Sequence, residues 1–322
     1  MSQSTVSLVL SGKSRGRISG RTEEAVRRAA EDLGYRPNVS ARALRTGATR
    51  TVGFVVPDVT HPFFGRTMRG AQQAAAKAGY AVMLVDVPGD GDWGLTPVEA
   101  LREGPADGFI YFSVEPPAHR HRGEHMVVIE AAPGDLPWVR LDTEGGTDAA
   151  LEHLLELGHR RIARLGSRED FPTFVLRRQR WLAALERAGV EPVPELSAGS
   201  SFDFGDAAAA AGALLDATEP PTAIICDDDI LAGGVYLAMR ERGLGIPDDV
   251  SVVGFDDLSF ARVLSPPLTT IGADAERLGA IAFEALAAVM AGEAAGPGQV
   301  LPVELIVRES TAPPAAGSTA RR

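Results

Sequence analysis

The sequence predicts an α/β protein with two doubly wound parallel sheets, preceded by a small all-helical segment. From residue 51 onward, short apolar, β-branched runs alternate with alanine-rich helical segments. Fully apolar strands that alternate with helices indicate parallel sheets covered on both faces. The length from residue 51 to about residue 312 is enough for two such units. Before residue 51, the apolar residues follow helical spacing, which predicts a separate helical part.

The opening stretch, MSQSTVSLVLSG, predicts a short helix. Ser2 can cap it by accepting a backbone hydrogen bond through its side-chain oxygen. Val6, Val9 and Leu10 recur at helical spacing and form an apolar face, and Gly12 is suited to end the helix. The other face carries Gln3, Ser4, Ser7 and Leu8.

A second helix is predicted after Ser19, with Gly34 as its stop. Pro37 then interrupts the chain, and Asn38 can cap a short helix over residues 39–45. The polar residues around position 47 predict a linker, because glycine and small polar side chains favour irregular backbone.

The α/β part contains seven apolar runs that predict strands. They are TVGFVVP (51–57), YAVMLVDV (80–87), DGFIYF (107–112), MVVIEA (126–131), RRIARLG (160–166), TAIIC (222–226) and VSVVGFD (250–256). The predicted helices cover 66–78, 145–157, 177–188, 206–217, 230–242 and 275–290.

The final residues, 313–322, are of low complexity and predict a disordered tail.

Charge is distributed unevenly along the chain. The net charge is −11, but residues 1–50 hold ten basic and four acidic side chains, a net charge of +6 that leaves −17 for the remainder. A basic N-terminal part on an acidic body suggests that the N-terminal part binds a polyanion. The alternative is an ordinary solvated helical face.

Composition excludes several classes of protein. A hydrophobic content of 45% and a charged content of 23% are ordinary for a globular protein. No apolar run is as long as a membrane-spanning helix, and the N-terminus lacks the pattern of an export signal. The single cysteine, Cys226, excludes an internal disulfide framework and suits a reducing compartment. We therefore expect a cytoplasmic protein.

The usual motifs of catalysis and cofactor binding are missing from the sequence. It has no phosphate-binding loop, dinucleotide-binding glycine pattern, zinc-protease motif or serine-hydrolase elbow. Histidines at 119–125 (HRHRGEH) suggest a metal site, but their surroundings favour a polar loop. The segment CDDD (226–229) places three carboxylates together at a strand end. Because neighbouring strand residues point to opposite faces, the three do not easily converge on one metal ion. A helix cap plus one pocket carboxylate is favoured instead. We expect no enzymatic activity, no metal and no cofactor.

Five segments identify a family. They are SQSTVSLVLSGK, RISGRTEEAVRRAAEDLGYRPNVSARALRTG, TVGFVVPDVTHPFF, LELGHRRIARLG and GIPDDVSVVGFDDLSFARVLSPPLTTI. In this order they resemble the lactose/galactose repressor (LacI/GalR) family of bacterial transcription regulators. The resemblance extends from residue 1 to about residue 310.

The resemblance implies a DNA-binding head joined to a two-lobed effector domain of the type I periplasmic-binding-protein fold. The chain would divide into a truncated helix-turn-helix head (1–37), a hinge helix and linker (38–50), an effector-binding and dimerisation domain (51–312) and the tail (313–322). The first lobe would comprise about 51–141 plus 272–299, and the second about 142–271 plus 300–312.

The resemblance also implies a function. We expect a homodimer, or a dimer of dimers, that represses transcription at pseudo-palindromic operator DNA under the control of a small ligand, expected to be a sugar. The alternative is a cytoplasmic sugar-binding protein that has lost DNA binding. A sugar-active enzyme on the same scaffold is a further alternative, but the sequence offers it no catalytic group.

The family match assigns roles in DNA binding to the first helix. Gln3, Ser4 and Leu8 match base-reading positions: Gln and Ser can bond base edges, and Leu offers apolar contact. The hydroxyls of Ser2, Thr5 and Ser7 match phosphate-facing positions, which set register rather than sequence preference. The alternative for all six is an ordinary helix surface.

The match extends to the hinge. Residues 39–45 resemble a helix that lies in the minor groove beside its partner's copy. Leu44 matches the leucine that wedges between base steps, and the neighbouring Asn38, Arg42 and Arg45 supply polar and basic groups. The alternative for Leu44 is packing against the head.

Six residues match positions in the family's ligand cleft. An arginine donating in pairs, carboxylates accepting from hydroxyls and aromatic rings covering an apolar face would suit a sugar. The alternatives are core packing for the phenylalanines, a structural ion pair for the arginine and an aspartate, and a shift of register to Arg178. The six are Phe63, Phe64, Arg177, Phe202, Asp228 and Asp256.

Three features depart from the family pattern. Arg180, beside Trp181, stands where the family usually has glycine, and residues 89–108 look short for the second helix of the first lobe. Both are expected to reshape the cleft. The first helix of the helix-turn-helix is missing, and Met1 stands where the family often has valine. We expect the true start to lie upstream; the alternative is a chain that binds DNA weakly or not at all.

Overall fold

The computed structural model describes residues 2–10, 14–35, 48–87, 106–112, 125–130, 136–293, 296 and 298–315. The chain forms two compact units, Met1–Arg50 and Thr51–Arg322.

The first unit contains two helices, α1 (Gln3–Leu10) and α2 (Gly20–Asp32), as the sequence predicts. The Ser2 hydroxyl accepts a hydrogen bond from the backbone N–H of Thr5 at 3.2 Å, and Ser19 caps α2. Val9 of α1 and Val26 of α2 are buried, so apolar burial supplements the two caps. The predicted hinge helix over 39–45 lies outside the described residues.

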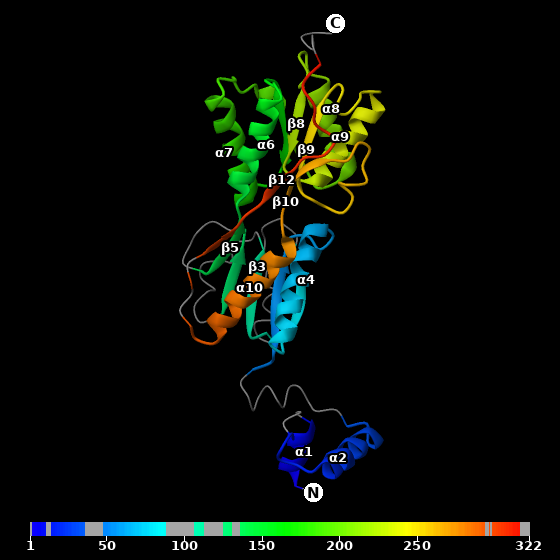
Figure 1. The fold of residues 1–322 in the computed structure, drawn as a ribbon, viewed down its shortest axis with the longest axis vertical. Helices are drawn as coiled ribbons and strands as arrows, with labels where there is room; N and C mark the ends of the chain where they lie inside the picture. The colour runs from blue at the N-terminus through cyan, green and yellow to red at the C-terminus, as the bar shows by residue number, and fades with distance from the viewer. Residues whose placement is uncertain are drawn as a thin grey trace. The chain divides into compact units, whose positions relative to one another are not determined.

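The second unit contains two six-stranded sheets, each the centre of one lobe (Figure 1). The first sheet has the order β11-β5-β4-β3-β1-β2 and is parallel at every described pairing. Its strands are β1 (Thr51–Val56), β2 (Ala81–Asp86), β3 (Gly108–Phe112), β4 (Met126–Ile129), β5 (Trp138–Leu141) and β11 (Gln299–Leu301).

The second sheet has the order β12-β10-β9-β8-β6-β7, and only β12 runs antiparallel to its neighbour. Its strands are β6 (Ile162–Ser167), β7 (Ser197–Ser200), β8 (Ala223–Cys226), β9 (Ser251–Asp256), β10 (Thr269–Gly272) and β12 (Glu304–Ile306). The chain returns from this sheet to the first lobe after Gly272 and leaves the first sheet again after Leu301. Both crossings fall one or two residues later than the predicted lobe boundaries, because backbone pairing retains Gly272 in the second sheet and residues 300–301 in the first.

Helices cover the sheets as the alternating pattern predicts. In the first lobe, α4 (Pro62–Lys77) and α10 (Ala275–Met290) pack side by side (Figure 1). In the second, α6 (Thr143–Glu156) and α7 (Pro172–Arg187) lie on one face, and α8 (Phe204–Leu215) and α9 (Asp229–Glu241) on the other. Several helices begin earlier than predicted: α4 and α7 each start at a proline, which suits a first helical turn.

The contact between α4 and α10 depends on glycine. A Cβ atom on Gly279 would lie 1.8 Å from the carbonyl oxygen of Thr67, and one on Gly70 would lie equally close to that of Glu276. Because backbone atoms occupy these positions, the helices must separate to admit any side chain.

We expect Gly279→Ala to lower the free energy of unfolding by about 1–3 kcal/mol or more, because overpacking against backbone has no cheap relaxation. Urea unfolding followed by circular dichroism measures the loss. Gly65→Ala, on the same α4, is the matched control: its Cβ would meet no atom within 4 Å. It should gain up to ~1 kcal/mol from helix propensity. Equal stability of the two variants would contradict the close crossing.

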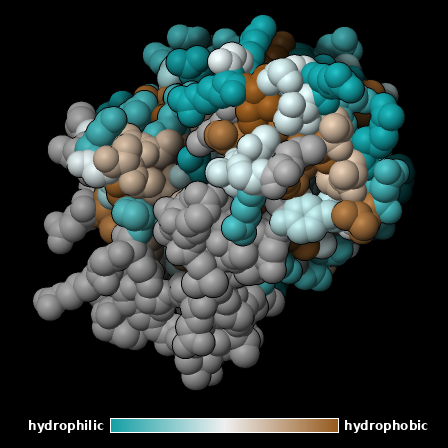
Figure 2. Space-filling model, turned by 90° about the horizontal axis from the view of Figure 1, so that it is seen from below, coloured by the Kyte–Doolittle hydropathy of each residue, from teal (hydrophilic) through white to brown (hydrophobic). Residues whose placement is uncertain are grey.

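No helix among the described residues is long and apolar enough to cross a membrane. On the face seen in Figure 2, the coloured hydrophobic residues form small groups between hydrophilic ones. Scattered exposed apolar side chains of this kind are ordinary on a protein surface.

Candidate functional site

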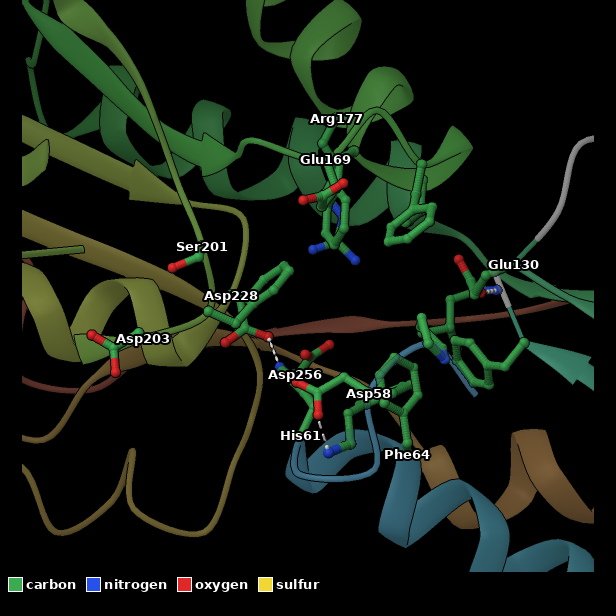
Figure 3. Close-up of a pocket in the computed structure, with 18 residues that line it drawn as sticks. Asp58, His61, Phe64, Glu130, Glu169, Arg177, Ser201, Asp203, Asp228 and Asp256 are labelled. Atoms are coloured by element: carbon green, nitrogen blue, oxygen red, sulfur yellow. Dashed lines mark hydrogen bonds and ion pairs between the residues drawn. The ribbon is translucent and has the colours of Figure 1, made fainter. Parts of the chain in front are cut away.

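A cavity of about 320 Å³ lies in the second unit, where strand ends of both lobes approach each other (Figure 3). Open parallel sheets bind ligands at the carboxyl ends of their strands. Carboxylates and phenylalanine rings dominate its wall. The lining residues are Pro57, Asp58, His61, Phe63, Phe64, Phe112, Glu130, Leu141, Glu169, Phe171, Thr173, Phe174, Arg177, Ser201, Phe202, Asp203, Asp228 and Asp256.

All six residues predicted for a ligand cleft line this one cavity. Phe63 and Phe64 lie in the first turn of α4, and Arg177 lies on α7. Phe202 precedes α8, Asp228 is the residue before α9, and Asp256 ends β9. Five different elements of two lobes therefore bring them together.

The aromatic rings form two groups, which the ring of His61 joins by contacts with Phe64 and Phe202. Phe64 lies edge-on to Phe112 with ring centroids 4.7 Å apart, and Phe63 contacts the same ring at 6.0 Å. Phe202 contacts Phe174 at 5.4 Å. Phe63 both lines the cavity and packs in the core of the first lobe, so for this residue the core-packing alternative is also correct.

Arg177 points into the cavity (Figure 3), and Arg178 is not among the lining residues. Arg177 is only 6% exposed, whereas the Arg178 side chain is 49% exposed and lies 3.7 Å from Asp170. The Arg177 guanidinium donates to the backbone carbonyl of Asp227 and stacks on the Phe255 ring, 3.5 Å from its centroid. Its Nε is buried and has no hydrogen-bond partner in the described part of the chain. The guanidinium is thus held in place with donor capacity to spare.

His61 and Asp228 connect the two lobes. Nδ1 of His61 accepts a hydrogen bond from the backbone N–H of Phe63 at the start of α4, so Nε2 carries the proton and donates to Asp228 at 3.0 Å. The other Asp228 oxygen accepts from the backbone N–H of Ile230 at the start of α9. The caps of two helices, one from each lobe, are therefore hydrogen-bonded to each other.

Asp256 lies beside this pair. Burial, and then the neighbouring charge of Asp228, hold the pKa of Asp256 well above its usual range. Burial also opposes the charge on Asp228, yet His61 and its hydrogen bond lower the pKa of Asp228. Burial disfavours the charge on His61 as well, but Asp228 raises its pKa. Asp228 is therefore ionised more readily than Asp256.

The three aspartates of CDDD have separate partners. Asp227 forms a buried ion pair with Arg164, Asp228 caps α9 and lines the cavity, and Asp229 accepts from Leu258 and Thr270. They do not converge on one ion, in agreement with the alternation of a strand.

A different trio has the spacing of a cation site: His61, Asp228 and Asp256 each offer one ligand atom, and these atoms lie within 4.8 Å of one another. The direct His61–Asp228 bond already joins two of the three residues, which favours hydrogen bonding to an organic ligand. Of the suggested histidine cluster, 119–124 lies outside the described residues, and His125 bonds the carbonyl of Asp107.

Several cavity residues were not predicted from the sequence. His61 lies between a predicted strand and a predicted helix, and Glu130 lies at the end of a predicted strand run. Both positions are at strand ends, where a ligand site is expected. Arg180, expected to reshape the cleft, contacts Asp148 on α6 and does not line the cavity, and Trp181 is buried in the second lobe's core. Most of the segment 89–108 lies outside the described residues.

The predicted DNA-contacting helix presents polar side chains. Gln3, Ser4 and Ser7 are exposed, as is the capping Ser2, while Thr5 and Leu8 are half-buried. Of the predicted apolar face, Val9 is buried and Val6 and Leu10 are half-buried, and Leu8 of the predicted polar face is half-buried as well. The remaining predicted DNA contacts lie outside the described residues: Asn38, Arg42, Leu44 and Arg45.

Comparison with known proteins identifies both units. Residues 1–38 match the model for bacterial regulatory proteins of the lacI family, and residues 151–311 match a periplasmic binding protein-like domain. The chain is 31% identical over 319 residues to the HTH-type transcriptional repressor CytR of Escherichia coli K12, covering 97% of this chain and 93% of CytR. The chain belongs to the LacI family.

Solved structures agree with this assignment. A complex of the transcriptional regulator CelR with cellobiose is 29% identical, with a TM-score of 0.72 over 97% of this chain and 96% of that one. The lac repressor dimer bound to operator and the anti-inducer ONPF is 25% identical, with a TM-score of 0.83 over 96% and 95% of the two chains. This LacI-family protein is a DNA-binding transcriptional regulator under the control of a small ligand.

Proposed function

We propose that this LacI-family protein is a dimeric repressor whose operator affinity is set by a sugar-class ligand bound between its lobes. The observation that carries the proposal is the cavity itself, where Arg177, two aspartates and a phenylalanine wall converge from both lobes. Hydroxyl groups of a sugar can accept from the guanidinium and donate to the carboxylates, while the rings cover its apolar face. The CelR–cellobiose complex supports this ligand class by similarity.

The mechanism follows from the position of the cavity. A ligand that contacts both lobes favours the conformation in which the lobes are close, and it can shift the equilibrium only by its difference in affinity for the two conformations. Lobe closure in each subunit would alter the dimer contacts of the first lobes and hence the pairing of the two hinge segments on DNA.

A thermal-shift and gel-shift pair tests the proposal on the full chain. D-Ribose, cellobiose, D-glucose, D-galactose and purine bases are screened for a concentration-dependent rise in melting temperature. Compounds that raise it are then added to a titration of the DNA upstream of the gene. A ligand that stabilises the protein and changes DNA affinity supports ligand-controlled repression; DNA binding with no response to any such ligand contradicts it.

Leu44→Ala is expected to weaken operator binding by about 10- to 100-fold, because it removes an apolar side chain worth ~1.5–3 kcal/mol when buried between base steps. Fluorescence anisotropy with labelled upstream DNA measures the loss, and the thermal shift by ligand should be unchanged. Wild-type DNA affinity in this variant would contradict the wedge role.

A further inference from the structure

The buried part of the cavity wall holds more acidic than basic side chains. Three carboxylates of the wall are buried, those of Glu130, Asp228 and Asp256, and the only buried basic side chains of the wall are His61 and Arg177. The other acidic groups lie at the rim and are exposed or half-buried: Asp58, Glu169 and Asp203.

Two of the three buried carboxyl groups accept hydrogen bonds from nitrogen donors. Asp228 is bonded to His61 and to the start of α9. Glu130 accepts the backbone N–H of Leu141. Asp256 is only 6% exposed and lies against the carboxyl group of Asp228, and no nitrogen donor among the described residues is hydrogen-bonded to its side chain. Two buried carboxyl groups this close do not both ionise readily, and a cationic group on a ligand would stabilise the charge of both.

The backbone around Asp256 supports a ligand-directed role. Asp256 has φ of 100° and Asp257 has φ of 48°, both unusual for residues other than glycine. Arg66 of α4 donates to the carbonyl oxygens of both residues, at 3.3 and 3.2 Å. Strained backbone that is held by a side chain from the other lobe is typical of a functional site.

Apart from Arg177 and the buried hydroxyl of Thr173, the wall offers few side-chain donors and is rich in π surface. The Nε2 proton of His61 is committed to Asp228, and Ser201 donates to Asp206. Six phenylalanines supply ring faces and edges: Phe63, Phe64, Phe112, Phe171, Phe174 and Phe202. Aromatic faces beside carboxylates attract a positive charge.

We propose that the effector carries a protonated amino group, and that Asp256 binds this group against the phenylalanine wall. The inference rests on the proposed function, in which this cavity is the effector site. The cavity of about 320 Å³ is at the small end of the ~300–1,000 Å³ range of ligand sites, which suits an amino sugar or a cyclic amine of that size. Arg177 remains available to hydroxyl oxygens of the same ligand. A phosphorylated sugar is disfavoured, because it would add negative charge to an acidic wall.

The first test needs no ligand. Asp256→Asn is expected to raise the melting temperature of the ligand-free full chain by about 2–4 °C at pH 7.5, because it removes an acidic group that is buried beside the carboxylate of Asp228. Asp229→Asn is the matched control: Asp229 is also buried but accepts from Leu258 and Thr270. It should lower the melting temperature. A fall for Asp256→Asn similar to that of Asp229→Asn would show that Asp256 serves the fold and would overturn the proposal.

The second test compares matched ligands. D-Glucosamine, D-galactosamine and cyclohexylamine, their hydroxyl counterparts, glucose 6-phosphate and zinc chloride are titrated into the wild-type chain and the Asp256→Asn variant. For at least one amine, we expect the concentration that stabilises the wild type to be at least tenfold lower than that of its hydroxyl counterpart. In the Asp256→Asn variant, we expect this difference to disappear.

Each other outcome has a defined meaning. Stabilisation by neutral sugars but not by amines overturns the amino-group proposal and leaves the proposed function standing. Stabilisation by zinc chloride alone, if Asp256→Asn removes it, has the same two consequences. No response to any amine also overturns it. A ligand shift that survives both Asp256→Asn and Arg177→Gln contradicts the cavity as the effector site, and with it the proposed function.

Discussion

Replacing Arg177 by glutamine is expected to lower effector affinity about 100-fold, because hydrogen bonds from a buried charged donor contribute ~1.5–3 kcal/mol each. Arg177 is the only arginine in the described wall of the cavity, and its Nε has no hydrogen-bond partner among the described residues. The thermal shift produced by the strongest ligand of the screen should disappear at concentrations that saturate the wild type, and repression should no longer respond to that ligand.

Arg178→Gln is the matched control for this prediction. It removes the same charge one residue away, but from a half-exposed side chain that faces Asp170 outside the cavity. Its ligand response should stay within about twofold of wild type, since surface ion pairs contribute ~0–1 kcal/mol. Equal responses of the two variants would contradict the placement of Arg177. The melting temperature without ligand separates lost binding from lost folding.

Replacing Asp227 by alanine is expected to lower the free energy of unfolding by about 3–5 kcal/mol, because it leaves the buried guanidinium of Arg164 without its counter-charge. Asp227 and Arg164 are both buried and in direct contact, and the Asp227 carboxylate also accepts from the backbone N–H of Ser167 at 3.1 Å. Denaturant unfolding followed by circular dichroism measures the change.

Asp216→Ala provides the comparison, since the Asp216–Arg242 pair at 2.7 Å is more exposed than the Asp227–Arg164 pair. It should cost far less than Asp227→Ala, because solvent screens an exposed ion pair. Replacing both members of the buried pair, as Arg164→Met with Asp227→Leu, should recover much of the loss, because two matched apolar side chains carry no charge to desolvate. A small loss for Asp227→Ala alone would show that water or a rearranged side chain reaches Arg164.

Local sequence patterns predicted much of the regular structure, because apolar periodicity and caps act over a few residues. The strand runs at 51–57 and 250–256 correspond to β1 and β9, and Ser2 and Ser19 cap the helices that they precede. Short strands such as β7 were not predicted: its residues, SAGS, carry little strand preference and owe their conformation to pairing with β6.

The residues of the cavity were predicted by motif, one segment at a time. Phe64 and Arg177 came from family patterns, and so did Asp228 and Asp256. Motifs could not show that His61 bonds Asp228, because 167 positions separate the two residues and only the approach of the lobes brings them together. The choice between Arg177 and Arg178 also needed the orientation of α7.

The sequence by itself determined the fold class, the family and the residue types available for DNA and ligand contact, because these depend on patterns within short segments. Only the tertiary structure decided which carboxylates have partners. Asp227, Asp228 and Asp229 are adjacent in the chain, yet one pairs with an arginine, one bonds His61 and one accepts from Leu258 and Thr270. That Asp256 is buried beside Asp228 could be recognised only there, because the surroundings of a buried carboxyl group come from segments far apart in the sequence.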